Sequence, residues 1–325
     1  MSSIPIVSTS FAHLFISFLM QKGHPVRRWL VDASLPMSLL DNVDGYVSEY
    51  HLRKFIEDAA KKTGLNELGL LVAESSSMTE LGELTVQMKD AENLYESLAL
   101  FCHNVADVNS HATFWLSEHE GKTWFCRANP EELEIGQHYA EQFTIAYMIK
   151  LVQLTTGVNW HPEHVWLKTS KNRGYIEHPY FCHSEIGFNR GLTAIMLPDI
   201  KGADVNIYPR FSTPEINPPN LTSTLSKLLK PYLSDMYPDI ELATELSRLN
   251  VRTLKRRLSE ENITYRELIQ QVRLELACSL LEKPGYRIID VASALSYANS
   301  GNFSRAFHRW TGMTPHEYQG KHHKT

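Results

Sequence analysis

Apolar spacing predicts two short helix pairs near the end of the chain. In the first pair, a helix over residues 239–249 precedes a second helix that begins after Asn250. Asn favours this position because its side-chain oxygen accepts from the free N–H groups of the first helical turn. Val251, Leu254 and Leu258 recur at i, i+3 and i+7, so we expect one buried stripe on this second helix.

The second pair repeats the pattern. A helix over 288–295 is followed by a turn at 296–299 and a helix over 300–310. Gly312 stops this last helix and Pro315 prevents its resumption. The aromatic residues at i, i+4 and i+7 predict a second buried stripe, made of Phe303, Phe307 and Trp310.

Basic residues fall opposite both stripes. Arg252, Lys255 and Arg256 lie on the outer face of the first pair, and Arg305 and Arg309 on that of the second. Long cationic donors opposite a buried face are typical of a helix that enters the major groove of DNA. Arginines that merely keep a surface soluble are the alternative for one such helix. Two copies favour binding to double-stranded DNA.

A longer helix is predicted between the pairs. A capping box at 264–267 opens an apolar-periodic segment that Pro284 and Gly285 end. A helix of about 20 residues is roughly 30 Å long. This length is close to the ~34 Å that separates successive major-groove faces on one side of the duplex. One chain is therefore expected to place both basic helices in adjacent grooves.

These residues resemble the DNA-binding domain of the AraC/XylS family of transcription regulators. The stretches that carry the resemblance are 251–258, 289–292 and 302–315, and it extends from near Leu221 to Tyr318. It implies an all-α domain with two helix-turn-helix units joined by a long helix. It also implies base-reading positions at Arg252, Lys255, Arg256, Ser300, Gly301, Asn302 and Arg305, with Ser304 and Arg309 nearer phosphate.

Two residues depart from the family pattern. The family usually has glycine in each turn, where this chain has Arg248 and Ser296. If these positions need a positive φ, a residue other than glycine costs on the order of 1 kcal/mol there. Gly301 offers no side chain, so only backbone or water-mediated contacts are expected from it.

Charge divides the chain in the same way. Residues 221–325 hold 15 Lys and Arg against 11 Asp and Glu, whereas residues 1–220 hold 17 against 26. A basic module within an acidic chain favours phosphate binding, because the release of cations from DNA contributes much of the affinity. A proline-rich segment at 209–221 indicates a linker between an effector-sensing domain, 1–208, and a DNA-binding domain, 222–325.

The N-terminal part has a mixed α+β pattern. Helices are expected at about 49–63, 91–105 and 134–156, a β-hairpin at 111–117 and 123–128, and strands near 164–169 and 192–197. The segments 81–84, 93–98 and 165–168 resemble the arabinose-binding-type effector domain of the AraC/XylS group. The resemblance implies effector binding or dimerisation. It does not imply that arabinose is the ligand.

A ligand pocket is expected among aromatic residues of this part, because small-molecule sites are mostly apolar with a few polar groups. The alternative is that these residues form the core. The candidates are Trp115, Trp124, Tyr139, Phe143, Tyr147 and Trp166.

Enzymatic signals are weak. No GxSxG, GxGxxG or GxxxxGK motif is present. His161 with His164, or His178 with Cys182 and His183, could supply metal ligands, but no HExxH or CxxC accompanies them. We therefore expect no catalytic residue, no metal and no cofactor.

The remaining features favour a cytoplasmic, nucleoid-associated protein. The four cysteines are far apart, which predicts free thiols in a reducing compartment. The apolar stretch 11–20 is too short to span a bilayer.

The whole pattern predicts a sequence-specific transcription regulator that responds to a small metabolite and acts on RNA polymerase. A regulator controlled by a protein partner, and a catalytic N-terminal domain fused to a DNA-binding module, stay open as alternatives. Whether the chain forms a homodimer also stays open.

Overall fold

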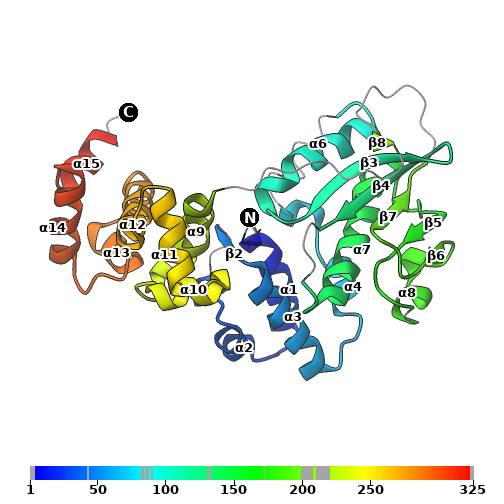
Figure 1. Cartoon of the computed structure of the whole chain (residues 1–325), viewed down its shortest axis with the longest axis horizontal. Coiled ribbons are helices and arrows are strands. Elements are labelled where there is room, and N and C mark those ends of the chain that lie inside the picture. The colour runs from blue at the N-terminus through cyan, green and yellow to red at the C-terminus, as the bar shows by residue number, and fades with distance from the viewer. Residues whose placement is uncertain are drawn as a thin grey trace. The chain divides into compact units, whose positions relative to one another are not determined.

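The computed structural model describes residues 4–41, 44–81, 84, 88, 91–129, 133–171, 173–198, 208–209 and 220–322. They form two compact units (Figure 1). The mixed unit contains Pro5–Ala33 and the described residues of 49–218, and the helical unit contains Ile4, Ser34–Ser48 and residues 220–322. The predicted fold class, a mixed N-terminal region and an all-helical C-terminal region, is confirmed. Most of the expected linker, 210–219, lies outside the described residues.

A six-stranded sheet forms the centre of the mixed unit. Its strand order is β6-β5-β7-β4-β3-β8, with parallel pairing of β5 to β6 and of β3 to β8 and antiparallel pairing elsewhere. The strands are β3 (Thr113–His119), β4 (Lys122–Ala128), β5 (His164–Trp166), β6 (Glu185–Gly187), β7 (Thr193–Met196) and β8 (Tyr208–Pro209). The predicted hairpin is β3 and β4. The residues of its turn, Glu120 and Gly121, have φ of 53° and 71°, as a tight two-residue hairpin turn requires.

The sheet has two chemically different faces, because side chains alternate along a strand. Phe114 pairs with Arg127, and Trp115 pairs with Cys126. Phe114 and Phe125 pack edge-on against Phe101, so they share one face. The other face carries a separate buried cluster that consists of Trp115, Trp124, Cys126, Ala194 and Met196, with Trp166 packed against it.

Helices complete the mixed unit. The three predicted helices are confirmed, as α3, α6 and α7, although α6 and α7 begin three residues later than expected. Asn93 caps α6 by accepting from the N–H of Glu96 at 3.0 Å, and Gly136 precedes α7 with a positive φ of 60°. The elements are β1 (Ile6–Ser8), α1 (Thr9–Gln21), α2 (Val26–Asp32), α3 (Glu49–Thr63), α4 (Leu68–Ser75), η2 (Met78–Leu81), α6 (Leu94–Val108), α7 (Gln137–Thr156), α8 (Arg173–Glu177) and η4 (Pro179–Phe181).

The helical unit contains both predicted helix pairs, as α10 with α11 and α13 with α14. The capping box of the long helix α12 is formed by Thr264 and Glu267. The elements from residue 220 onward are α9 (Leu221–Leu229), η5 (Lys230–Ser234), α10 (Ile240–Ser247), α11 (Val251–Glu260), α12 (Tyr265–Leu281), α13 (Ile288–Ala294), α14 (Ser300–Thr311) and α15 (Pro315–His322).

Two core expectations for this unit need correction. Leu254, Leu258, Phe303 and Phe307 are fully buried, as predicted. Val251 is 37% exposed, because it stands at the first position of α11, where no neighbouring turn covers it. Trp310 is only half-buried, since it borders a hollow between α12 and α14.

A segment from the N-terminal part belongs to the helical unit, which the sequence did not indicate. We call Ser34–Ser48 the strap; it contains η1 (Met37–Leu40) and β2 (Tyr46–Ser48). The hydroxyl of Ser38 donates to the carbonyl of Pro231 at 2.7 Å, and the N–H of Met37 donates to Asp235 at 2.6 Å. Tyr232 donates to the carbonyl of Ser34 at 2.8 Å. These bonds hold the strap on η5.

Both turns of the helix pairs have the left-handed backbone that the family pattern implied. Arg248 has φ 56° and Ser296 has φ 55°. We expect Arg248→Gly to raise the free energy of unfolding by about 1 kcal/mol, because glycine has no Cβ to strain this conformation. Ser296→Gly would relieve the same strain but lose the hydrogen bond that the Ser296 hydroxyl donates to the carbonyl of Leu233 at 2.6 Å. Urea denaturation of Arg248→Gly measures the gain, and an unchanged or lower midpoint would contradict the prediction.

Candidate nucleic-acid interface and ligand cavity

The outer face of α11 is basic and exposed. Arg252, Lys255 and Arg256 are exposed, while Leu254 and Leu258 hold the opposite face in the core. Asn250 caps the helix by accepting from the N–H of Thr253 at 2.8 Å, as predicted. Arg256 pairs with Glu260. Among the described residues, no ion pair or side-chain hydrogen bond restrains Arg252 or Lys255, so both are available to a ligand.

The second pair ends in a similar helix. Asn299 caps α14 by accepting from the N–H of Asn302 at 2.8 Å. Arg305 and Arg309 are exposed, and Arg305 donates to the side-chain oxygen of Asn302 at 2.5 Å. This bond orients the guanidinium and leaves its other donors free. The neighbouring candidates differ in exposure: Gly301 is exposed, and Ser300 and Ser304 are partly exposed.

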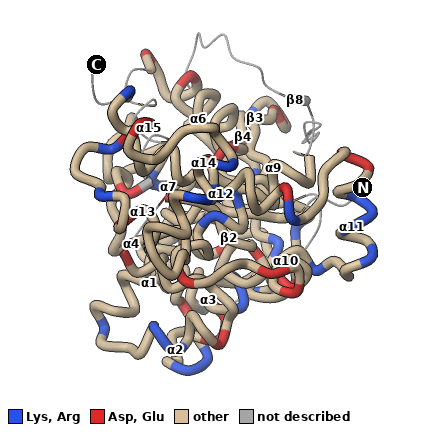
Figure 2. The backbone as a smooth tube through the Cα atoms, turned by 90° about the vertical axis from the view of Figure 1, so that its left-hand side faces the viewer, with Lys and Arg blue, Asp and Glu red and all other residues tan. Residues whose placement is uncertain are grey.

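The two basic helices lie on opposite sides of α12 (Figure 1). This helix has 17 residues, fewer than expected, and is about 26 Å long at 1.5 Å per residue. Figure 2 shows Lys and Arg along α11 and α12. The helical unit therefore presents two cationic helices that one rigid element separates.

A basic hollow beside α14 was missed by the sequence analysis. Arg266, Gln270 and Arg273 of α12 line it together with Asn302, Arg305 and Arg309 of α14. Arg273 is fixed, because it donates to the carbonyl of Leu295 at 2.6 Å and stacks 4.0 Å from the ring centre of Tyr297. The signal was the spacing of i, i+4 and i+7, which places the three α12 residues on one helix face.

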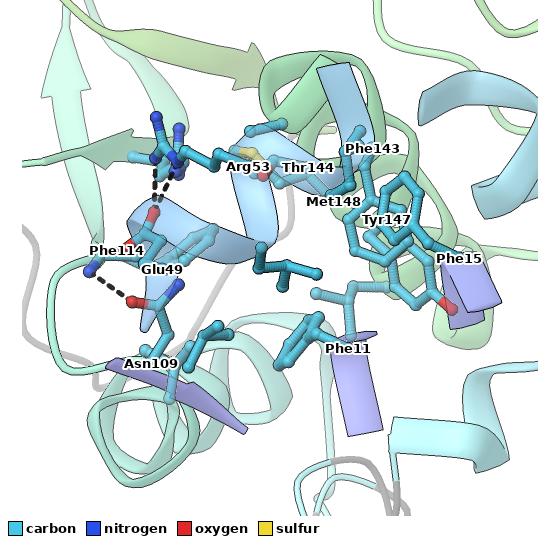
Figure 3. A pocket seen from close by; sticks show the side chains of 18 of the residues that line it. Phe11, Phe15, Glu49, Arg53, Asn109, Phe114, Phe143, Thr144, Tyr147 and Met148 are labelled. Carbon is cyan, nitrogen blue, oxygen red and sulfur yellow. Dashed lines mark hydrogen bonds and ion pairs between the residues drawn. The ribbon is translucent and has the colours of Figure 1, made fainter. Parts of the chain in front are cut away.

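The mixed unit contains a cavity between α1, α3, α6, α7 and the phenylalanine face of the sheet. About 780 Å³ in it is free of protein atoms, part of it open to solvent. Its wall is predominantly apolar; the aromatic members are Phe11, Phe15, Phe101, Phe114, Phe143 and Tyr147. In Figure 3, Glu49, Arg53 and Asn109 lie on one side of it, and Phe11, Phe15, Phe143 and Tyr147 on the other. The cavity thus has a polar end and an apolar body.

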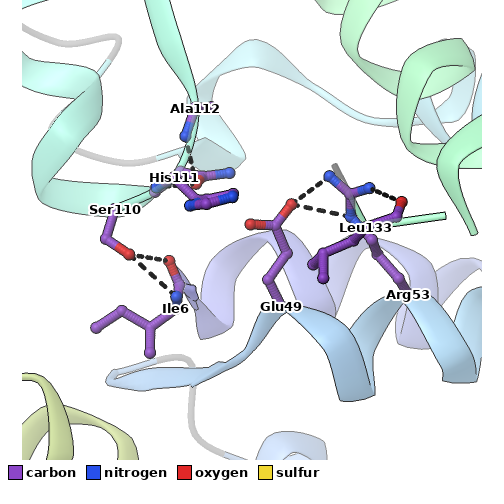
Figure 4. Close-up of polar contacts among 8 residues, drawn as sticks. Ile6, Glu49, Arg53, Ser110, His111, Ala112 and Leu133 are labelled. Atoms are coloured by element: carbon purple, nitrogen blue, oxygen red, sulfur yellow. Dashed lines mark hydrogen bonds and ion pairs between the residues drawn. The ribbon is translucent and has the colours of Figure 1, made fainter. Parts of the chain in front are cut away.

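A buried ion pair shapes the polar end. Arg53 donates from Nε to Glu49 at 2.9 Å and from Nη1 to the carbonyl of Leu133 at 3.0 Å (Figure 4). The second oxygen of the Glu49 carboxylate has no hydrogen-bond partner. Asn109 accepts from the N–H groups of His111 and Ala112, both at 3.0 Å, so its oxygen closes the turn before β3. Glu49 and Arg53 come one turn apart at the start of α3.

A second cation, Arg127, reaches the same end from β4. Its side chain is buried, and its Nε has no hydrogen-bond partner. Burial, together with the positive charge of Arg53, lowers the pKa of the Arg127 guanidinium to about 10, against the opposite effects of Glu49 and Glu141. The group is still protonated at neutral pH. A buried cation whose donor lacks a partner is costly unless something binds it.

Two family models match this chain. Residues 23–200 match the model described as the arabinose-binding domain of AraC transcription regulator, N-term, and residues 242–321 match a helix-turn-helix domain. The first match alone covers more than half of the chain. The chain belongs to the AraC family of transcription regulators.

Each of two curated relatives matches about a quarter of this chain. The chain is 33% identical over 91 residues to the HTH-type transcriptional regulator VqsM of Pseudomonas aeruginosa, covering 28% of each chain. It is 35% identical over 83 residues to the ornithine utilization regulator of the same organism, covering 26% of this chain and 24% of that one. The chain thus spans about a quarter of the length of these relatives. The solved transcriptional regulator CdpR of Pseudomonas aeruginosa is 19% identical, with a TM-score of 0.39, over 91% of this chain and 96% of that chain.

The aromatic residues predicted for the AraC-type effector site fall into separate places. Phe143 and Tyr147 line the cavity. Trp115, Trp124 and Trp166 lie in the cluster on the other face of the sheet. Trp115 and Trp124 alternate with Phe114 and Phe125 along β3 and β4, so they cannot share a face with these phenylalanines. Tyr139 lies one turn before Phe143 on α7 and is not part of the lining.

The sequence analysis also missed the polar members of the cavity. Glu49 and Arg53 have the i, i+4 spacing of a helical ion pair, which usually indicates a solvated face. Arg127 stands one residue after the buried Cys126 and one before Ala128, a strand position that gave no sign of burial. Only the fold brings α3 and β4 to the same cavity.

The described residues of this AraC-family chain offer few other candidate sites. Within it, no group of three or more His, Cys, Asp and Glu side chains could hold a metal ion. His161 and His178 both contact backbone atoms of Tyr180, at 3.3 Å in each case. The four cysteines are free thiols, as their spacing predicted. No helix of the described residues is long and apolar enough to cross a membrane.

Proposed function

We propose that this AraC-family chain is a transcription regulator that binds specific double-stranded DNA sequences and whose mixed unit senses a small molecule. In this proposal α11 and α14 enter successive major grooves. Arg252, Arg256 and Arg305 donate to base edges, where guanine O6 and N7 suit a guanidinium. The surface that contacts the bases also includes Lys255, Ser300, Gly301 and Asn302. The phosphate contacts are made by Ser304 and Arg309. RNA polymerase is the expected protein partner of such a regulator.

The observation that carries the proposal is the repeated helix pair, whose second helix exposes arginine side chains in both copies. In both copies the second helix holds two fully buried side chains on one face and exposed arginines on the other. A surface that only needed solubility would not require the same geometry twice. The basic charge balance of residues 221–325 supports contact with phosphate.

The proposal is tested by binding the purified chain to fragmented genomic DNA and sequencing the retained fragments. A shared motif of two half-sites spaced by one helical turn is expected, since each second helix reads one groove. Retention of random sequences, with no enriched motif at any salt concentration, would contradict sequence-specific binding.

The strap connects the mixed unit to the helical unit through the polypeptide backbone. Ser48 ends the strap, and the next residue, Glu49, starts α3 and lines the cavity. A ligand that shifts Glu49 therefore acts on the backbone next to β2. For the ligand to influence the helical unit in this way, the ligand affinity must differ between the two conformations of that unit.

Removing one anchor of the strap tests its importance for the helical unit. Tyr232 is 3% exposed, and burial raises the pKa of its hydroxyl far above the usual range. We expect Tyr232→Phe to lower the free energy of unfolding by about 1–2 kcal/mol, because the partly buried carbonyl of Ser34 loses its donor. Tyr286, which is 40% exposed, provides the control variant Tyr286→Phe. Equal midpoints of urea denaturation for both variants would show that the strap is not anchored in this way.

A further inference from the structure

We propose that the cavity of the mixed unit binds a small amphipathic monocarboxylate, with the carboxylate at Arg127 and the apolar part among the phenylalanines. This inference rests on the proposed sensing function and names the class of ligand. It depends on three features of the cavity: an unpartnered buried cation, carboxylates nearby that do not satisfy it, and an apolar body of suitable size.

The first feature is Arg127. The residue is 7% exposed, lies on the cavity wall, and its Nε finds no acceptor. Among the described residues, it forms no ion pair. A guanidinium presents its donors in a planar fork that matches a carboxylate, and bidentate pairs of this kind are strong. A neutral hydroxyl could accept only one of these hydrogen bonds.

The second feature is that neither nearby carboxylate forms an ion pair with Arg127. Glu49 is bound by Arg53 through one oxygen, and its other oxygen has no hydrogen-bond partner. Glu141 accepts from the N–H groups of Lys168 at 2.8 Å and Thr169 at 2.9 Å, and from the hydroxyl of Thr193. Both carboxylates favour the charged form of Arg127, but burial and Arg53 outweigh them. With Glu49, Arg53 and Arg127 on its wall, the cavity itself carries one excess positive charge.

The third feature is the apolar body. Phe143 packs against Tyr147 with ring centres 4.4 Å apart and against Phe15 at 5.1 Å, and Phe101 meets Phe114 edge-on at 5.1 Å. Leu52, Ile56, Val105 and Met148 fill the wall between these rings. The empty space of about 780 Å³, which includes open solvent, is bounded mainly by these apolar side chains. Polar metabolites such as sugars would leave their hydroxyl groups without partners there.

Calorimetric titration of the full chain with matched probes tests the inference. The probes are octanoate and 4-phenylbutanoate, with 1-octanol, 4-phenyl-1-butanol and octylamine as their neutral and cationic counterparts. We expect at least one of the two acids to bind, and each acid that binds to do so at least about tenfold more tightly than its alcohol, because a charge-assisted pair is added. The amine should bind weakest. Equal binding of acids and alcohols, preference for the amine, or no binding of either acid would overturn the inference.

Three variants assign the effect to Arg127. Arg127→Met keeps the unbranched stem of the side chain without the guanidinium and should abolish the preference for the acid, whereas Arg127→Lys should retain part of it. Arg127→Met is expected to fold, because it removes a buried charge whose burial is unfavourable. Arg190→Met is the matched control, since Arg190 is exposed and stacks 5.0 Å from Trp166 outside the cavity. Unchanged acid preference in a folded Arg127→Met variant would overturn the inference.

DNA binding measured on the same preparations separates this inference from the proposed function. Specific DNA binding without acid binding would refute only the proposal that the cavity binds a carboxylate. Acid binding without specific DNA binding would refute only the proposal that the chain is a sequence-specific regulator.

Discussion

Replacing Arg252 and Arg305 together with alanine should weaken binding to the enriched DNA motif by at least about thirtyfold. Each guanidinium that pairs with guanine contributes about 1–3 kcal/mol of discrimination. The two residues lie on different helices, α11 and α14, so their losses should add. Fluorescence anisotropy with a labelled duplex, at one fixed salt concentration, gives both affinities.

Controls for this result use other arginines of the chain. Arg28→Ala, at an exposed position of α2 in the mixed unit, should leave the affinity unchanged. Arg309→Ala should weaken binding to all sequences by a similar factor and reduce the salt dependence by about one ion, as expected of a phosphate contact. If the Arg252 and Arg305 double variant kept its affinity and its preference for the motif, the assignment of α11 and α14 as reading helices would be wrong.

Truncating Phe303 should have the largest effect on stability. This residue is fully buried in α14 and packs 5.7 Å from both Phe307 and Tyr297, measured between ring centres. Phe303→Ala is expected to cost about 3–5 kcal/mol, since it loses buried apolar area and leaves a cavity. This is a large fraction of the 5–15 kcal/mol that typically stabilises a domain. The second helix pair should therefore melt and release α14.

Thermal denaturation followed by circular dichroism measures this loss, and DNA binding of the same sample measures its consequence. Ile289→Ala is the control, because Ile289 is 56% exposed in the same helix pair and should change stability by less than about 0.5 kcal/mol. A similar melting temperature for both variants would mean that Phe303 does not support the reading helix.

The helices of the helical unit could be predicted from the sequence because their signals lie within a few residues of one another. Asn250, Thr264 and Gly312 sit at helix ends where their side chains or backbone satisfy unpaired groups, and all three do so in the structure. The buried stripes of α11 and α14 follow from spacing alone, with Val251 and Trp310 as the exceptions at the margins. The family's usual glycines at Arg248 and Ser296 raised the question of a positive φ there, and the structure shows it at both.

The cavity of the mixed unit could not be predicted in the same way. Aromatic content drew attention to Trp115, Trp124 and Trp166, yet these fill the far face of the sheet. A strand segment shows by alternation that two faces exist, but not which face a helix will cover. The cavity depends on α1, α3, α6 and α7 all meeting the face that carries Phe114 and Arg127.

The sequence by itself determined the two helix pairs, their caps, their cationic faces and the mixed pattern of the N-terminal part, because each depends on residues within a few turns of one another. The tertiary structure decided what depends on distant segments. It placed the strap with the helical unit, and it brought Glu49 and Arg53 of α3 to Arg127 of β4. Residues next to Arg127 in the sequence do not show that its charge is buried or that its Nε has no hydrogen-bond partner. Both arise only when elements far apart in the chain exclude water from the same place.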